Sequence, residues 1–145
     1  MKAILQRISE GKVVIDGETV AQCGKGLMVL LGVAQGDTEE DARLLAAKIT
    51  KMRIFADEND KMNLSVADIG GGVMVVPNFT LLASYRKGNR PDYLQSAAPD
   101  EAKRLFEYFT ALIAAEIPDT THGQFGADMK VASVNDGPVT ILYDL

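Results

Sequence analysis

At residues 26–34 the sequence reads GLMVLLGVA, a run in which every position is apolar or glycine. A strand that is buried on both faces needs such a run, because neither of its two alternating rows of side chains meets water. The run is far too short to cross a membrane, which takes about 18 apolar residues. We therefore expect residues 26–34 to form a strand buried on both faces of a sheet.

Other strands are predicted on both sides of this run. They cover residues 2–8, 12–15, 19 onward, 73–83, 124–134 and 139–143. Asp16-Gly17 is typical of a tight hairpin, because both turn positions need positive φ. Pro77 indicates an edge or a bulge in its strand. A turn at residues 135–138 is expected to join the last two strands.

Two segments have the spacing of amphipathic helices. Residues 37–53 form the first, with Asp37 and Glu40 predicted as a capping box. Pro99 begins the second, because the first helical turn tolerates a missing N–H, and Pro118 ends it. The expected buried residues are Ala42, Leu45, Ile49 and Met52 in the first helix, and Ala102, Leu105, Phe106, Phe109, Leu112 and Ile113 in the second. Six or seven strands with two helices predict one α+β domain over residues 1–145, a compact, barrel-like curved sheet covered by helices.

Charge and cysteine content narrow the classes of function. The 145 residues carry a net charge of −5, which argues against a protein that wraps the backbone of a nucleic acid. Local contact with one end of an RNA remains open. Cys23 is the single cysteine, so no internal disulfide is expected and a reducing cytoplasm is the expected compartment. The chain turns polar after its first five residues, so no signal peptide is expected.

Residues that bind metals or act as activated nucleophiles are scarce. His122 is the only histidine, and it lies in a segment predicted as a loop, where it would make a poor rigid base. We interpret it as solvated and non-catalytic. One histidine, one cysteine and no spaced carboxylate cluster predict no metal and no cofactor. No P-loop, GxGxxG, HExxH or GxSxG motif is present.

Two short segments stand out, PNFTL at residues 77–81 and NDGPVT at residues 135–140. Taken alone, the first is typical of a bulged strand and the second of a tight turn. Together with other blocks they make the chain similar to the D-aminoacyl-tRNA deacylase family from end to end. The blocks are MKAILQR at 1–7, GLMVLLGV at 26–33, RIF at 53–55, Asp57, KMN at 61–63, KGNRPDY at 87–93, GQFGADM at 123–129 and NDGPVT at 135–140. Several blocks in the same order are far more specific than any one of them.

The resemblance implies a homodimer that hydrolyses the ester of D-aminoacyl-tRNA, with active sites at the subunit interface. It implies that Gly137-Pro138 is a cis peptide that enters the partner's site and contacts the substituents of the α-carbon through main-chain atoms. Arg7 would help to hold that segment. Asn78, Phe79 and Thr80 would line the pocket for the terminal adenosine and the scissile ester. The corresponding pocket-wall positions are Phe125, Ala127 and Met129. Glycyl-tRNA is a further expected substrate, because glycine has no side chain to reject.

One departure from the family bears on specificity. The family's first motif usually begins Ser-Gln, and here those positions are Pro77 and Asn78. Proline removes a hydroxyl and a backbone donor at once. A related deacylase that removes L-alanine from mischarged tRNA has proline there, so that activity is one alternative. A non-catalytic module that binds an RNA end and a dimeric scaffold are the others.

Two mechanisms are consistent with these residues. Thr80 would act as nucleophile only beside a base, and the sequence offers no obvious one. Alternatively, the 2′-hydroxyl of the tRNA assists while backbone N–H groups near Phe79 and Thr80 stabilise the oxyanion. We favour the second. For tRNA binding, the dense positive cluster of Arg86, Lys87 and Arg90 is expected to contact phosphates of the acceptor end. Lys2, Lys12 and Arg7 are candidate extensions of this cluster.

Overall fold

The computed structural model describes residues 1–86 and 88–144. Its strands are β1 (Lys2–Ile15), β2 (Glu18–Cys23), β3 (Gly26–Gly32), β4 (Phe55–Ala56), β5 (Met62–Leu64), β6 (Gly72–Pro77), β7 (Thr120–His122) and β8 (Lys130–Asp144). The main sheet has the order β2-β1-β3-β6-β7, with β8 also paired to β1. β1 is antiparallel to β2, β3 and β8, whereas β3–β6 and β6–β7 are parallel. A small separate sheet joins β4 to β5.

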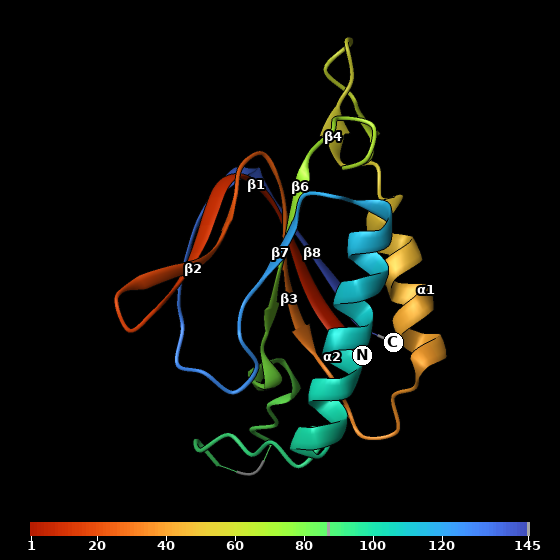
Figure 1. Ribbon diagram of the computed structural model, residues 1–145. Coiled ribbons are helices and arrows are strands. Elements are labelled where there is room, and N and C mark those ends of the chain that lie inside the picture. The colour runs from red at the N-terminus through yellow and green to blue at the C-terminus, as the bar shows by residue number, and fades with distance from the viewer. Residues whose placement is uncertain (87, 145) are drawn as a thin grey trace.

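The main sheet curls until its two ends nearly meet (Figure 1). Thr121 Oγ1 of β7 donates a hydrogen bond of 3.1 Å to Gln22 O of β2. This curvature encloses one group of buried side chains inside the sheet, listed as Ile8, Val13, Ala21, Cys23, Met28, Met74 and Val76. The fold is therefore α+β with a nearly closed, barrel-like sheet and two helices.

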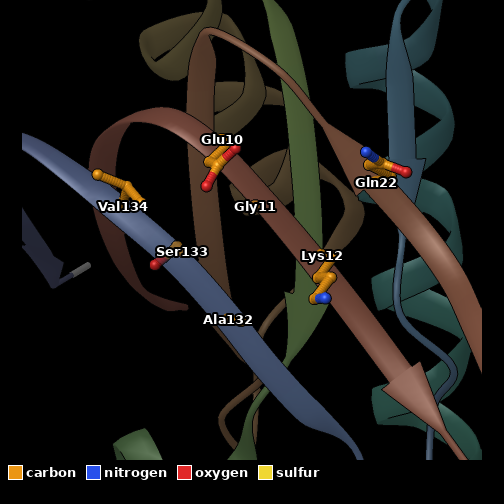
Figure 2. A pocket seen from close by; sticks show the side chains of 7 residues that line it. All are labelled: Glu10, Gly11, Lys12, Gln22, Ala132, Ser133 and Val134. Atoms are coloured by element: carbon orange, nitrogen blue, oxygen red, sulfur yellow. The ribbon is translucent and has the colours of Figure 1, made fainter. Parts of the chain in front are cut away.

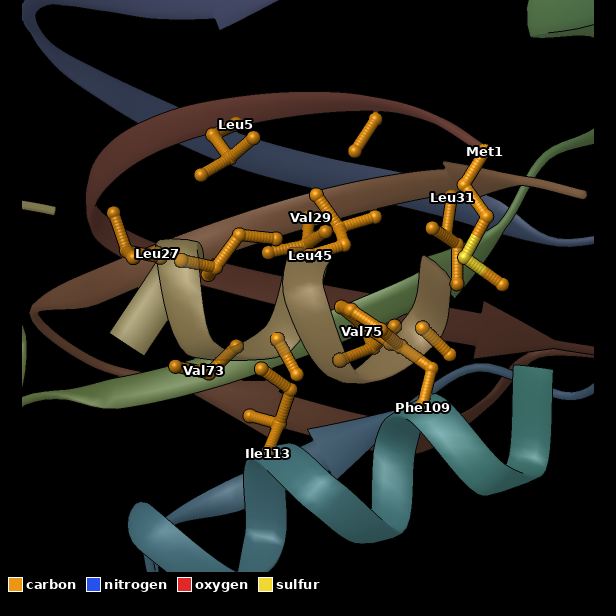
Figure 3. Packing of buried hydrophobic residues seen from close by; sticks show 14 of the residues in the cluster. Met1, Leu5, Leu27, Val29, Leu31, Leu45, Val73, Val75, Phe109 and Ile113 are labelled. Atoms are coloured by element: carbon orange, nitrogen blue, oxygen red, sulfur yellow. The ribbon is translucent and has the colours of Figure 1, made fainter. Parts of the chain in front are cut away.

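The larger core lies between the outer face of the sheet and the two helices (Figure 3). Leu27, Val29 and Leu31 of β3 point into it, whereas Met28 points into the barrel. The predicted strand buried on both faces is therefore confirmed for residues 26–32, whereas residues 33 and 34 lie beyond its end. A Cβ built at Gly26 would lie 1.9 Å from Gly72 O, so β3 and β6 approach each other more closely there than any other residue allows.

The helices pack on this core as their spacing predicted, but the first begins at a different residue. α1 (Glu39–Thr50) is capped by Thr38, which exchanges hydrogen bonds with Asp41. The predicted cap at Asp37 is wrong, because the Asp37 carboxylate instead accepts from the Met1 ammonium and from Ala34 N. α2 (Pro99–Glu116) starts at the predicted proline. No helix within residues 1–86 and 88–144 is long and apolar enough to cross a membrane.

Two strand predictions and one turn prediction need correction. The segment 73–83 is a strand only to Pro77, after which a 3-10 helix, η1 (Phe79–Leu82), turns the chain. The segment 124–129 is a loop, since β8 begins at Lys130. Residues 135–138 do not reverse the chain, because the segments on both sides pair with β1 in the same direction. They form a bulge, in which Asn135 lies opposite Ile8 and Thr140 opposite Gln6. The tight turn at Asp16-Gly17 is confirmed, with φ of 49° and 82°.

Candidate active site

A pocket of about 660 Å³ opens where β6 ends and η1 begins. Its lining residues are Met28, Leu30, Val76, Pro77, Asn78, Phe79, Thr80, Phe125, Gly126, Ala127, Asp128, Met129 and Val131. The pocket thus brings together two predicted groups, residues 77–80 and the wall positions Phe125, Ala127 and Met129. The remaining lining residues were missed by the sequence analysis. The alternation of β3 could have found Met28 and Leu30, because side chains two residues apart share a face.

Pro77 occupies a place where the sheet does not need its missing donor. In the parallel ladder it lies opposite Leu31, and the next donor, Asn78 N, binds Leu31 O at 2.8 Å. On the other side β7 has ended, and Gly123 N binds Val75 O at 2.8 Å. A Cβ at Gly123 would lie 3.4 Å from Pro77 Cδ. The proline therefore ends β6 without leaving a vacant hydrogen-bond position, as expected at a strand end.

Asn78 holds Thr80 at the start of η1. Asn78 Oδ1 accepts from the Thr80 hydroxyl and also from Thr80 N, the latter at 3.2 Å. The Thr80 N–H is thus already bonded within the chain, and the stabilisation of an oxyanion by N–H groups near Phe79 and Thr80 stays a prediction. This arrangement also places an amide oxygen, which is not a useful base, against the hydroxyl. The geometry gives Thr80 a fixed position and does not activate it as a nucleophile.

Arg7, Gly137 and Pro138 do not line this pocket. Arg7 Nε donates to Asp136 O at 3.0 Å, and Arg7 Nη1 donates to Ile54 O at 2.7 Å. Asn135 Oδ1 accepts from Val139 N at 3.0 Å, so both sides of the bulge are tied. The Gly137-Pro138 peptide is cis, as the resemblance implied.

Glycine is required at position 137 on two counts. Its φ is +135°, a conformation that L side chains rarely adopt. A Cβ there would also lie 3.0 Å from the backbone atom Val139 N. Gly137 and Pro138 are nevertheless exposed. The bulge is therefore a fixed element that presents backbone outward.

The expected positive cluster is only partly described. Lys87 lies outside the described residues, and Arg86 and Arg90 are exposed on a loop closed by two hydrogen bonds, Ser84 N to Asp92 O at 2.9 Å and Asp92 N to Ser84 O at 2.8 Å. Arg86 and Lys2 line one surface hollow of about 330 Å³.

The other two cations considered for the cluster lie elsewhere. Lys12 lines a different hollow, with Glu10 and Gln22 (Figure 2). Arg7 is committed to the bulge and only 16% exposed. Of the three candidate extensions, Lys2 alone lies near the loop.

His122 and Cys23 lie outside the pocket. His122 is at the end of β7, a strand that the sequence analysis assigned to a loop, and its Nδ1 lies 2.8 Å from Gly123 O. Cys23 is buried, and burial together with the Asp119 carboxylate raises the pKa of its thiol to about 11. A thiol with that pKa stays protonated near neutrality and is a poor nucleophile.

Within the described ranges, no group of three His, Cys, Asp or Glu side chains could hold a metal ion.

Comparison with known proteins gives consistent results. Residues 4–144 match the family described as D-Tyr-tRNA(Tyr) deacylase. A protein of Ruegeria pomeroyi named D-aminoacyl-tRNA deacylase is 52% identical over 145 residues, with all of both chains covered. One of Geobacter sulfurreducens with the same name is 51% identical over 144 residues, covering 99% of this chain and 95% of the other.

Solved structures share the fold. One titled "c-Myc DNA Unwinding Element Binding Protein" superposes with a TM-score of 0.94 at 34% identity, covering 100% of this chain and 99% of the other. A probable eukaryotic D-amino acid tRNA deacylase reaches a TM-score of 0.85 at 17% identity, covering 99% and 98%. At that identity the second likeness concerns the fold alone.

Proposed function

Because this chain belongs to the D-Tyr-tRNA(Tyr) deacylase family, we propose that it hydrolyses the ester of D-aminoacyl-tRNA in the cytoplasm and releases the D-amino acid and the tRNA. The observation that carries the proposal is the pocket, in which residues 77–80 and the 125–129 loop form one mostly apolar lining. Its volume of about 660 Å³ suits a nucleoside bearing an amino acid, since ligand pockets measure about 300–1,000 Å³.

Thr80 acts in this proposal by position. Asn78 fixes its hydroxyl and its N–H, which orients the start of η1 against the ester. The Phe79 N–H, which bonds to no other described residue, is the donor that we assign to the developing oxyanion. The neighbouring 2′-hydroxyl of the substrate's ribose assists the hydrolysis. An aminoacyl ester is already activated, so this modest machinery suffices.

Chiral selection is assigned to the bulge at Gly137-Pro138 of a second copy. D- and L-amino acids carry the same groups, so only a rigid surface beside the α-carbon separates them. The bulge is exposed, lies outside its own chain's pocket and is tied by Arg7 and Asn135. These properties suit an element that enters a partner's pocket. We therefore propose a homodimer with its active sites at the subunit interface.

The acceptor end of the tRNA is assigned to the loop that carries Arg86, Lys87 and Arg90. Among described residues, neither Arg86 nor Arg90 takes part in an ion pair within the chain. Both guanidinium groups are exposed, so phosphate binding would break no internal contact. In a chain of net charge −5, such a local cluster fits contact with one RNA end.

Deacylation of matched D- and L-tyrosyl-tRNA tests the proposal, with a chelator present and with L-alanyl-tRNA and glycyl-tRNA as further substrates. We expect rapid loss of D-tyrosine, cleavage of glycyl-tRNA and protection of L-tyrosyl-tRNA. Pro77 is the observation that favours a second activity, removal of L-alanine, and faster cleavage of L-alanyl-tRNA than of D-tyrosyl-tRNA would establish it instead. Binding without turnover of any substrate would assign the chain to a non-catalytic RNA-end module.

A further inference from the structure

Exposed aromatic side chains lie at the pocket rim and on the loop next to it. Phe79 is 56% exposed, Tyr85 74% and Tyr93 39%, although large aromatic residues usually bury most of their surface. Phe79 lines the pocket, and its ring packs edge-to-face on Tyr93 with centroids 4.9 Å apart. The apolar surface therefore continues from the pocket to residue 93.

An antiparallel backbone bridge joins the segments that carry Tyr85 and Tyr93, which extend from it in opposite directions. Ser84 and Asp92 exchange two backbone hydrogen bonds of 2.9 and 2.8 Å, and Tyr85 and Tyr93 each follow one of these two residues. The base of the loop thus holds both tyrosines, one of which contacts the pocket rim through Phe79. The aromatic rings are presented by a closed backbone structure.

Positive charge accompanies the rings. Tyr85, Arg86 and Lys2 line the same hollow of about 330 Å³. Lys2 is partly neutralised by Asp144, whose carboxylate lies 3.3 Å from its Nζ, so Arg86 is the main cation. Stacking rings beside cations are the combination by which proteins bind unpaired nucleic acid strands, the rings for bases and the cations for phosphates.

We propose that Tyr85 and Tyr93 stack on the unpaired nucleotides that precede the terminal adenosine of the tRNA, while Arg86 contacts a phosphate between them. This inference rests on the proposed function, because it takes the terminal adenosine to occupy the pocket. An RNA strand is favoured over a protein partner because the surface is continuous with the pocket and carries cations. Recognition then extends from the pocket along the single-stranded end.

The test compares charged tRNA with D-tyrosyl-adenosine, which carries the ester but lacks the upstream nucleotides. Tyr85→Ala should raise KM for D-tyrosyl-tRNA by about 5- to 160-fold, the range for loss of one stacked base. Its effect should be confined to the longer substrate, and Tyr85→Phe should restore the low KM. Leu94→Ala is the matched control, because Leu94 is 78% exposed in the same segment but has no aromatic ring. Tyr93→Phe, which preserves the contact with Phe79, should behave like the unmodified chain.

Binding of an uncharged RNA tetranucleotide ending in CCA, measured by fluorescence anisotropy, gives a readout that does not depend on catalysis. Tyr85→Ala should weaken it by a similar factor without changing its salt dependence, whereas Arg86→Ala should reduce the salt dependence. Equal changes on both substrates, or no change on either, would overturn the stacking role. Failure of the unmodified chain to cleave either substrate would instead refute the proposed function, and weakened tetranucleotide binding by Tyr85→Ala would still support the stacking surface.

Discussion

Replacing Thr80 by valine separates a positional role from a chemical one. Valine keeps the β-branched shape and removes the hydroxyl that donates to Asn78 Oδ1. The Thr80 N–H keeps its own bond of 3.2 Å to the same oxygen, so the start of η1 should retain its backbone. The substitution therefore removes one side-chain hydrogen bond and leaves the rest of the pocket unchanged.

The expected loss in hydrolysis rate follows from the free energy that this hydrogen bond contributes. A hydrogen bond between neutral groups contributes about 0.5–1.5 kcal/mol, which corresponds to a loss of about 2- to 13-fold in rate. Removal of a catalytic nucleophile costs on the order of 10⁶-fold. Single-turnover hydrolysis of D-tyrosyl-tRNA distinguishes these values easily, and Thr80→Ser serves as the control that keeps a hydroxyl.

The same assay with tRNA ending in 2′-deoxyadenosine examines the assisting group. Loss of the 2′-hydroxyl should slow hydrolysis by the unmodified protein by about 10²- to 10⁴-fold, the range for positioned proton transfer. The deoxy substrate should therefore be affected more than the valine variant. A loss of 10⁵-fold or more in Thr80→Val, with full activity on the deoxy substrate, would refute substrate assistance and make Thr80 the nucleophile.

Three further outcomes are expected. Arg7→Ala should lower the free energy of unfolding by about 3 kcal/mol, because two bonds from a charged donor are lost. It should also weaken protection of L-tyrosyl-tRNA, and chemical denaturation with L-substrate assays checks both effects, with Arg7→Lys as the charged control. Arg86→Ala should reduce the slope of log affinity against log salt by about 0.7–1, and an unchanged slope would mean that Arg86 contacts no phosphate. Cys23 has a folded pKa of about 11 against 9.0, so stability present below pH 9 should decline as the pH rises towards 11. Cys23→Ala should remove that part of the decline in denaturation curves.

Much of the architecture could be predicted because it depends on patterns within one segment. The apolar run at 26–34, the glycine turn after Asp16 and the proline that begins α2 each act within a few residues. Predictions from local sequence were wrong where pairing with distant strands decided the structure of a segment. Residues 135–138 have turn composition, yet β1 holds the segments on both sides of them and converts the turn into a bulge.

The candidate site was predictable only in part for a similar reason. The sequence motifs at residues 77–80 and 125–129 can be recognised from the sequence. The pocket that they share depends on the curvature of the sheet. The occupation of the Thr80 N–H by Asn78 depends on one side-chain rotamer, which no spacing reveals. The choice of Thr38 over Asp37 as a helix cap depends on two hydrogen bonds that already occupy Asp37, one from the distant Met1 ammonium and one from the nearby Ala34 N–H.

The pairing of β1 with β8 has a consequence for the order in which the protein is made. β1 is synthesised long before β8, yet its Lys2 and Gln6 pair with Asp144 and Thr140 of that strand. Contacts between such distant residues form late, because a long loop must close before they contribute stability. During synthesis, one edge of β1 therefore stays unpaired until β8 has been made. The bulge at Gly137-Pro138 cannot be anchored to Arg7 before β8 has been made. The element that we propose for chiral selection therefore takes its place after both helices and the other strands have been synthesised.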